Sequence, residues 1–198
     1  MKLPNTLFQL MMMALLLSSG LLQAQNKVSL SPLWKTDVKT FLENSPVLAH
    51  LSGGDESQVI VAGREDLIAL DGNGNEIWKY RSQGRYMMSP SVWEQKGKSP
   101  LIYTADYGSY LRCHDSKGKV LWEAKLNAPC TWSSPAVANL REDGVTTIIQ
   151  GDESGSIFAF EALSGKPVWK SAIKGKPSTA AVGDLDGKRG LEIAYLST

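Results

Sequence analysis

The best candidates for metal binding lie near the carboxyl end of the sequence. Asp184 and Asp186 belong to an Asp-Leu-Asp-Gly turn, and Glu192 follows it, a spacing of oxygen ligands similar to that of a calcium loop. A full calcium site needs six or more oxygens, and Lys188 and Arg189 stand where a further acid would be required. These three carboxylates are therefore candidate calcium ligands, with a plain Asp-Gly turn as the favoured alternative.

Groups that could act as a nucleophile or a general base are few and scattered. The two histidines, His50 and His114, have neither a metal-ligand spacing nor a nucleophile motif beside them. The two cysteines are Cys113 and Cys130. Cys130 lies about 30 Å along an extended strand from the residue expected opposite Cys113, which is outside disulfide reach. We therefore predict no catalytic residue and two buried or half-buried free thiols.

Polar and aromatic residues in short loops form a third set of candidates. Their loops are expected to emerge on one face, as a mixed surface suited to a peptide or a sugar. The members of this set are Arg64, Arg85, Tyr86, Asp106, Tyr107, Trp132, Asp152 and Glu153. Trp132 is the strongest single candidate because it belongs to no repeated series. For Asp106 and Asp152 we favour a second interpretation, in which each caps its own turn through hydrogen bonds from the backbone.

A repeat of about 44 residues positions these candidates. One series consists of Trp34, Trp78, Trp122 and Trp169, spaced by 44, 44 and 47 residues. A second consists of Ser45-Pro46, Ser89-Pro90, Ser134-Pro135 and the related Ser178-Thr179, spaced by 44, 45 and 44 residues. Two independent series that keep one period indicate a true structural repeat.

Each unit of the repeat is predicted to form four short strands. In the unit that begins at Ser134, β-branched and aromatic runs occupy 135–140, 146–150, 156–160 and 166–170, separated by Gly, Asp and Asn. No stretch after residue 25 shows a sustained helical period. Four-stranded units of 40 to 50 residues are typical of β-propeller blades.

A glycine stands four residues before the tryptophan in each of three units, at Gly74, Gly118 and Gly165. We expect a positive φ at each of these glycines, in the hairpin turn between the third and fourth strands. The tryptophans then lie on the outermost strands. We predict that each ring wedges between adjacent blades and buries on the order of 200 Å².

The fold class predicted from these patterns is all-β, an incomplete β-propeller of four-stranded antiparallel blades. Residues 25–198 would form it: a closing strand at 28–36, blades at about 45–80, 89–125 and 134–171, and a partial blade at 178–198. The partial blade holds two strands of the four, which predicts a fragment of a longer propeller.

Residues 1–24 have the pattern of a secretory signal peptide. Lys2 is followed by an uncharged segment whose apolar run, Leu7 to Leu17, is too short for the roughly 20 residues of a membrane span. Cleavage after Ala24 would leave 20 basic and 20 acidic residues. We therefore expect a secreted or periplasmic protein with no membrane span and no electrostatic affinity for nucleic acid.

The repeat resembles that of the PQQ-like (quinoprotein) propeller family. The segment from Phe158 to Trp169 is similar to the Ala-x-Asp-x-x-Thr-Gly-x-x-x-Trp motif of that family, and shorter versions precede Trp78 and Trp122. The segment from Ala181 to Gly187, with the strand after it, also resembles FG-GAP-like repeats. These likenesses cover nearly all of the mature chain and imply a fold rather than one activity.

The function expected from these features is that of an exported, non-catalytic propeller that binds or scaffolds a protein or a carbohydrate. One alternative is the amino-terminal part of a PQQ-dependent dehydrogenase, which would need PQQ and calcium. Another is a propeller domain fused to a polysaccharide-acting enzyme. The adjacent cysteine pair common at the cofactor site of the dehydrogenases does not occur in this sequence, so we expect no cofactor.

Overall fold

The computed structural model describes residues 31–198, of which Trp34–Thr198 form one compact unit. The predicted signal peptide lies outside the described residues. From residue 31 to residue 198 the chain forms strands and no helix, and so nothing in that range could cross a membrane as a helix. The predicted all-β class is confirmed.

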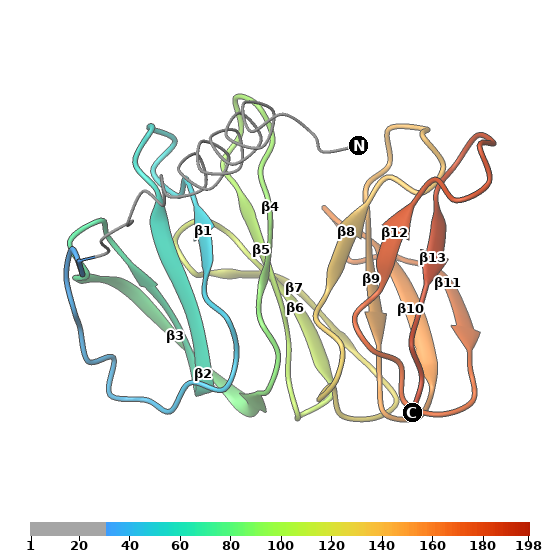
Figure 1. Cartoon of the computed structure of the whole chain (residues 1–198), viewed down its shortest axis with the longest axis horizontal. Helices are drawn as coiled ribbons and strands as arrows, with labels where there is room; N and C mark the ends of the chain where they lie inside the picture. The colour runs from blue at the N-terminus through green and yellow to red at the C-terminus, as the bar shows by residue number, and fades with distance from the viewer. Residues whose placement is uncertain (1–30) are drawn as a thin grey trace, which may run out of the picture. The chain divides into compact units, whose positions relative to one another are not determined.

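Four antiparallel sheets follow one another along the chain (Figure 1). The first has the order β1 (Val47–Ala49), β2 (Gln58–Leu70), β3 (Glu76–Tyr86). The second is β4 (Ser91–Trp93), β5 (Leu101–Ala105), β6 (Tyr110–His114), β7 (Val120–Lys125). The third is β8 (Ala136–Ala138), β9 (Thr147–Gly151), β10 (Ser156–Glu161), β11 (Pro167–Ala172). The last holds β12 (Ala181–Gly183) and β13 (Glu192–Ala194).

The first sheet differs from the prediction because one long strand, β2, takes the place of two. Its first half pairs with β1 through Gln58–Ile60, and its second half pairs with β3 through Asp66–Leu70. The segment between the halves is one residue shorter than the corresponding turn of the second sheet. Arg64, at a φ of 43°, makes the bend there and pairs with Tyr86. The second and third strands predicted for this unit are therefore one continuous strand, and the first sheet has three strands instead of four.

The strand predicted at 28–36 is absent from its described part. Residues 31–46 form no strand, and residues 28–30 lie outside the described residues. A β-strand needs a neighbour for its backbone hydrogen bonds, and no strand between residues 31 and 198 pairs with this segment. Its tryptophan nevertheless takes the predicted place against the first sheet.

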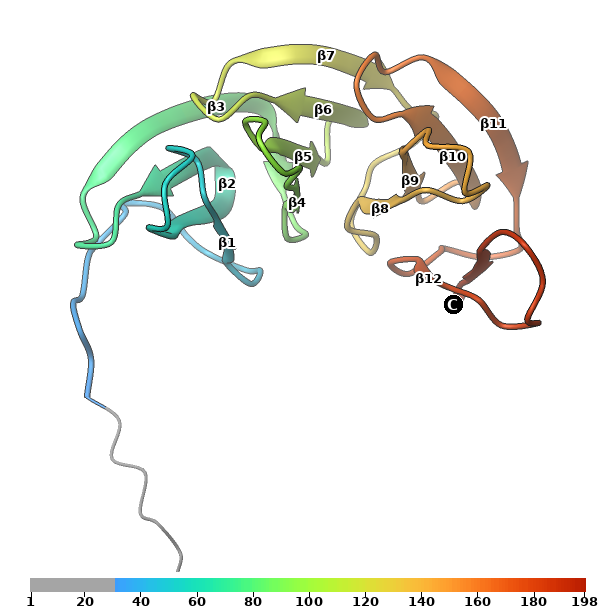
Figure 2. The same cartoon turned by 90° about the horizontal axis from the view of Figure 1, so that it is seen from above.

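Two hydrophobic clusters lie between neighbouring sheets, and a third, on β2, is covered by the segment that precedes the first sheet. One core joins the first two sheets and contains Ile60, Leu67 and Ile102, and another joins the second and third and contains Tyr103 and Phe160. The middle strands β5 and β9 are buried along their whole length, whereas the outer strand β7 alternates between half-buried and exposed residues. Figure 2 shows the short strands β1, β4 and β8 on the inner side and β3, β7 and β11 on the outer side.

The tryptophan series joins each sheet to the next through the predicted glycine turns. The rings of Trp34, Trp78 and Trp122 cover Gly74, Gly118 and Gly165, so closely that a Cβ on these glycines would lie 2.7, 2.6 and 2.6 Å from the ring. Their φ angles of 83°, 80° and 68° confirm the predicted hairpin turns.

Hydrogen bonds fix two of these indoles in addition. The indole N–H of Trp78 donates to the carbonyl of Ser116, and that of Trp122 donates to the carbonyl of Ala162, both at 3.0 Å. Each acceptor lies in the turn that the ring covers. The wedging of indoles between adjacent units is therefore confirmed for Trp78 and Trp122, whereas Trp34 covers Gly74 from a segment that forms no strand. Each of the three glycines satisfies both a backbone and a packing requirement.

Comparing alanine substitutions at Gly118 and Gly97 should separate the cost of backbone strain from the cost of the collision with the indole. We expect Gly118→Ala to lower the free energy of unfolding by about 2–5 kcal/mol, because backbone strain adds to the collision with Trp78. Gly97, at a φ of 74°, has open space around it, with no atom within 4 Å of the position that a Cβ would take. Gly97→Ala should therefore cost only about 1–2 kcal/mol. Urea unfolding of both variants measures the difference, and equal costs would contradict a packing role for the indole.

Candidate functional site

The candidate site is the surface made by the loops between second and third strands and the loops that connect one unit to the next; we call it the loop face. Backbone hydrogen bonds tie these loops together across units. The N–H of Tyr107 donates to the carbonyl of Arg85 at 2.8 Å, and the N–H of Glu153 donates to that of Pro129 at 3.0 Å. Residues predicted from different units are thus brought onto one surface.

Asp106 and Asp152 occupy matching positions on this face but are buried, with 0% and 2% exposure. Asp106 accepts the N–H of Tyr110 at 3.1 Å within its own turn, and Asp152 accepts that of Ser156 at 3.3 Å. Asp152 also accepts the N–H groups of Asn127 and Ala128 in the preceding connection, at 2.9 and 3.0 Å. The favoured interpretation, in which each aspartate caps its own turn, is confirmed, and the alternative that these two buried carboxylates contact a ligand is corrected.

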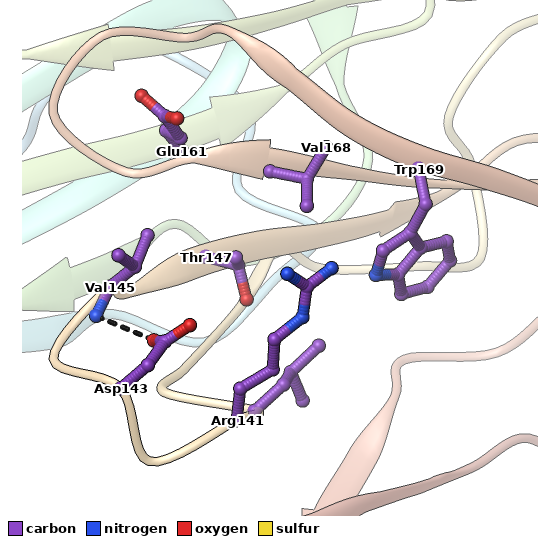
Figure 3. A pocket seen from close by; sticks show the side chains of 8 residues that line it. Arg141, Asp143, Val145, Thr147, Glu161, Val168 and Trp169 are labelled. Carbon is purple, nitrogen blue, oxygen red and sulfur yellow. Dashed lines mark hydrogen bonds between the residues drawn. The ribbon is translucent and has the colours of Figure 1, made fainter.

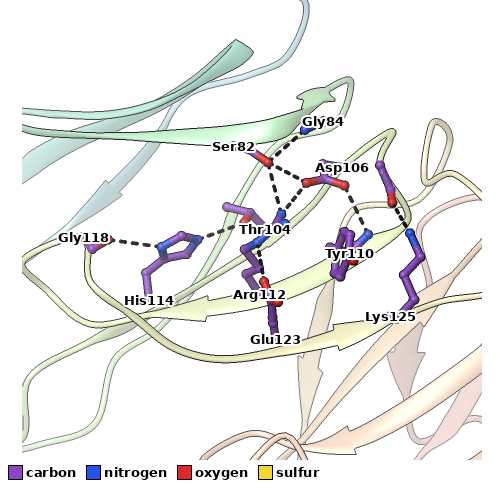
Figure 4. Close-up of polar contacts among 11 residues, drawn as sticks. Ser82, Gly84, Thr104, Asp106, Tyr110, Arg112, His114, Gly118, Glu123 and Lys125 are labelled. Atoms are coloured by element: carbon purple, nitrogen blue, oxygen red, sulfur yellow. Dashed lines mark hydrogen bonds and ion pairs between the residues drawn. The ribbon is translucent and has the colours of Figure 1, made fainter.

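Asp106 is also the centre of a buried polar network between the first two sheets (Figure 4). Its carboxylate accepts the hydroxyl of Ser82 at 2.6 Å and pairs with the guanidinium of Arg112, whose side chain is 4% exposed. Arg112 donates in addition to Glu123 at 3.1 Å. Gly84 lies so close that a Cβ there would meet the backbone nitrogen of Gly108 at 2.4 Å. Sequence reasoning missed Ser82 and Arg112.

His114 is fully buried beside this network (Figure 4). Its Nε2 lies 3.1 Å from the hydroxyl of Thr104, its Nδ1 lies 3.3 Å from the carbonyl of Gly118, and the ring of Tyr80 packs edge-on with centroids 4.7 Å apart. Burial lowers the pKa of His114 to about 4. The side chain is therefore a neutral packing residue.

Tyr86, predicted on the loop face, is instead buried with 0% exposure. It ends strand β3, where its ring joins the core between the first two sheets. Burial raises the pKa of its phenol far above the ordinary range. The prediction of an exposed contact at Tyr86 is wrong, because its side chain fills the space between sheets rather than the surface above them.

The exposed part of the loop face combines aromatic and charged side chains. Tyr107 and Trp132 are 54% and 58% exposed, as the sequence predicted, and Phe41 is 59% exposed, which the sequence analysis missed. Phe41 and Arg64 line an open groove of about 600 Å³. No signal marked Phe41, since the segment around it belongs to no complete unit.

Three predicted charged residues lie at the surface of this face. Arg64 is exposed at its strained bend. Arg85 pairs with Glu43 at 3.3 Å. Glu153 pairs with Lys176 at 2.7 Å and accepts the hydroxyl of Thr131, and these hydrogen bonds lower the pKa of Glu153. Such exposed pairs add little to stability and leave charges available to a partner.

The three predicted metal ligands are brought together by the turn after β12. One oxygen each from Asp184, Asp186 and Glu192 lies within 4.8 Å of the others. The same carboxylates also accept backbone N–H groups of their turn, and Asp186 pairs with Lys188 at 2.7 Å. Three acids with an ammonium among them are a poor ligand set for calcium, which prefers six or more oxygens.

The cysteines are both free and fully buried. Burial raises the pKa of the Cys113 thiol to about 12 and that of Cys130 still further. Thiols with a raised pKa hold little thiolate at neutral pH and are poor nucleophiles. Both therefore act as packing residues in the core between the second and third sheets.

A protein-family model described as outer membrane protein assembly factor BamB matches residues 18–189 of this chain. No curated protein matches it in sequence. Among solved structures, BamB from Moraxella catarrhalis is 17% identical, with a TM-score of 0.57 over 82% of this chain and 46% of that one. BBS1N, solved in complex with ARL6DN, is 16% identical, with a TM-score of 0.62 over 79% and 52%.

The quinohemoprotein alcohol dehydrogenase ADHIIG from Pseudomonas putida HK5 is 21% identical, with a TM-score of 0.53 over 72% of this chain and 22% of that one. At these identities the likeness shows the fold alone. The chain spans between 22% and 52% of the length of these three proteins. Together the matches confirm the predicted propeller built from PQQ-like repeats.

Removal of the Asp106 carboxylate tests whether a buried charge pair fastens the first two sheets. We expect Asp106→Ala to cost about 3–5 kcal/mol of unfolding free energy, because buried Arg112 would lose its buried counter-ion and keep only the exposed carboxylate of Glu123. Asp152→Ala removes the matching carboxylate where no buried cation faces it, and should cost about 1–3 kcal/mol. Chemical denaturation of the two variants gives the comparison. An equal loss would show that the guanidinium is not held by Asp106.

The pH dependence of stability should carry the signature of His114. Its pKa is about 4 in the folded chain, against 6.5 for a histidine open to solvent, so protonation favours unfolding. The stabilisation is complete above about pH 6.5 and should fall by roughly 2–3 kcal/mol on acidification to about pH 4.5. Urea titrations should show this slope in His50→Gln and a shallower slope in His114→Gln. Parallel slopes would refute the assignment.

Proposed function

Since this chain belongs to the PQQ-like propeller family described as outer membrane protein assembly factor BamB, we propose that it is an exported, non-catalytic scaffold that binds a protein through the loop face. The observation that carries the proposal is the exposure of Phe41, Tyr107 and Trp132 on neighbouring units of one surface. Aromatic side chains at a surface, with arginines near them, are typical of protein interfaces.

Rigidity of the loops supports a binding role. The buried carboxylates of Asp106 and Asp152 accept hydrogen bonds from the preceding unit, and backbone hydrogen bonds join each loop to its neighbour. The exposed aromatic groups are therefore held in fixed positions before a partner arrives. A preorganised surface loses less conformational entropy on binding than a mobile one.

The titratable groups near this surface support a role without catalysis. Asp106 is paired with Arg112, His114 is buried and neutral, and the cysteine thiols are protonated. The groups whose pKa is strongly shifted, His114 and the two cysteines, are buried, and the lowered pKa of Glu153 follows from its hydrogen bonds to Lys176 and Thr131. An active-site acid or base would be expected to combine exposure with a pKa shifted toward neutrality. The proposed scaffold needs neither PQQ nor calcium.

The proposed partner is a protein of the outer-membrane assembly process that the family description names. Export fits this proposal, because residues 1–24 have the pattern of a signal peptide. The partner would meet apolar side chains at the centre of the loop face and the charges of Arg64, Arg85 and Glu153 at its margin. In protein–protein binding, charged residues at the edge of an interface influence the orientation of the partner and the association rate. Buried aromatic contacts supply most of the affinity.

Site-specific photocrosslinking in the exporting cell tests the proposal. A photoreactive residue at position 107 or 132 should crosslink one and the same protein, and at position 163 it should not. Leu163 is a matched control because it is 63% exposed but lies in a turn at the opposite end of its sheet. Trp132→Ala should weaken binding of the purified partner roughly tenfold or more. Equal crosslinking from position 163, or none from the loop face, would contradict the proposal.

A further inference from the structure

A groove lies at the junction of the first two sheets, at the end opposite the loop face. It has two adjoining parts, of about 380 and 390 Å³, which share Leu51, Ser52 and Ser99 as walls. The loop between β1 and β2 and the loop between β4 and β5 form its sides (Figure 1). We call it the junction groove, and its walls come from four segments, within residues 50–58, 77–78, 94–100 and 116–117.

Hydrogen bonds between the two units hold the sides of the junction groove in place. In one part, Glu94 accepts the backbone N–H of His50 at 2.6 Å, and both of its carboxylate oxygens lie 3.1 Å from Nδ1 of His50. In the other part, the indole of Trp78 donates to the carbonyl of Ser116. The groove is therefore a fixed feature of the junction, and a ligand would lose little affinity to the ordering of its walls.

Two lysines of the junction groove have no counter-ion. Lys98 lines one part and Lys117 the other, and both are exposed. Within the part of the chain that the structure describes, neither forms an ion pair, whereas the carboxylate of Glu94 is paired with His50. The unpaired charge of the groove is therefore positive, and it is complementary to carboxylates.

The part of the groove near Lys117 also has an apolar surface and one buried polar group. Ile77 is 49% exposed there, beside Leu51 and the half-buried Trp78. Gln58 is only 4% exposed, and its Oε1 accepts the N–H of Leu51 at 2.7 Å. No described residue accepts a hydrogen bond from its Nε2. The amide nitrogen of Gln58 is therefore a donor available to a ligand in the groove.

Other cavities at this end of the sheets carry a different charge. The cavity beside Trp169, of about 160 Å³, is lined by Arg141 together with Asp143 and Glu161 (Figure 3). A cavity of about 250 Å³ beside Trp93, between the second and third sheets, has Glu161 as its charged residue. The positive charge of the junction groove is therefore particular to the first junction and does not follow from the repeat.

We propose that the junction groove binds an extended peptide segment of a partner protein, in which acidic side chains flank an aliphatic or aromatic one. The acidic side chains pair with Lys98 and Lys117. The apolar side chain contacts Leu51 and Ile77, and a backbone carbonyl of the peptide accepts a hydrogen bond from Nε2 of Gln58. Charge complementarity carries the proposal, which does not depend on the loop face. The scaffold would then hold two proteins, one at each end of its sheets.

A peptide fits the groove better than a nucleic acid or a polysaccharide. Trp78 is half-buried, with one face of its ring on Gly118, so the exposed apolar surface is the aliphatic side chain of Ile77. Single-stranded nucleic acids bind largely by stacking bases on open aromatic faces and by many phosphate contacts, and two lysines supply few of the latter. An acidic polysaccharide is a separate outcome of the test.

Selection from a phage-displayed library of random linear peptides tests the proposal on the full chain. The immobilised protein should enrich peptides in which acidic residues flank an aliphatic or aromatic one. An enriched peptide, made synthetically, should shift the indole N–H resonance of Trp78 and the amide resonances of residues 97–99 and 116–118 in 15N-labelled protein. Its affinity should fall as salt concentration rises, because the lysines are exposed.

Charge reversal of the two lysines shows whether the peptide binds where the proposal places it. Lys98→Glu combined with Lys117→Glu should weaken binding of the enriched peptide about tenfold or more, because attraction becomes repulsion. Lys96→Glu combined with Lys119→Glu is the matched control. It makes the same change of net charge at exposed positions of the same loop and turn, outside the walls of the groove. The control should leave the affinity unchanged.

Two further variants separate the groove from the loop face. Ile77→Ser should weaken binding of the peptide by about threefold or more, because it removes apolar contact area. Trp132→Ala, on the loop face, should not change it. Enrichment of no common motif, enrichment of a basic motif, or an equal loss in the lysine control would overturn the proposal. So would the same resonance shifts with oligogalacturonate and none with the peptide, which would identify an acidic polysaccharide as the occupant.

Discussion

Stacking of an indole on the glycine turn of the next sheet is the contact on which the rest of the structure depends. Each sheet has at most four strands, and the two larger hydrophobic clusters form where one sheet packs against the next. The distance between sheets must therefore be set by something more specific than apolar contact. Trp78 and Trp122 provide this through close ring contact and a hydrogen bond to the same turn. One residue pair thus fixes both spacing and register.

A second set of contacts acts at the other end of each sheet. Asp106 and Asp152 lie at matching positions, and each binds the connection that arrives from the preceding unit. Only the first of them faces a buried arginine, so the two junctions reach the same geometry with different chemistry. The buried polar side chains beneath the loop face therefore hold its loops in place through hydrogen bonds. The side chains that remain exposed there are both aromatic and charged, and the proposed protein-binding role rests on this combination.

The sequence was sufficient to predict the repeat, the strands and the junctions, because they leave periodic marks. The glycine four residues before each tryptophan predicted the hairpin turn through its positive φ. That the tryptophan of the preceding unit covers this glycine was shown only by the structure. Merging of two strands into β2 left no such mark, because it depends on a turn shorter by one residue at Arg64. Nor could the missing strand at 31–36 be foreseen, because strand formation depends on a neighbour that local sequence does not show.

The candidate site was predicted less completely than the fold. Tyr107 and Trp132 were found because loop residues without repeat counterparts are free to face solvent. Tyr86 was misplaced, since a residue at the end of a strand can turn inward or outward with the same sequence pattern. Ser82 was missed because its partners Asp106 and Arg112 lie in another unit, and pairings across units follow from the packing of sheets rather than from spacing along the chain. Arg112 was missed because its pairing with Asp106 of the same unit depends on a buried strand position that carries no repeated motif.

A double-mutant cycle between Trp78 and Gly118 tests the central contact most directly. We predict that Gly118→Ala costs about 1–3 kcal/mol less in a Trp78→Ala background than in the native chain, because only backbone strain remains once the ring is gone. If the two substitutions were additive, the indole would not be resting on the glycine, and the proposed basis of sheet spacing would be contradicted.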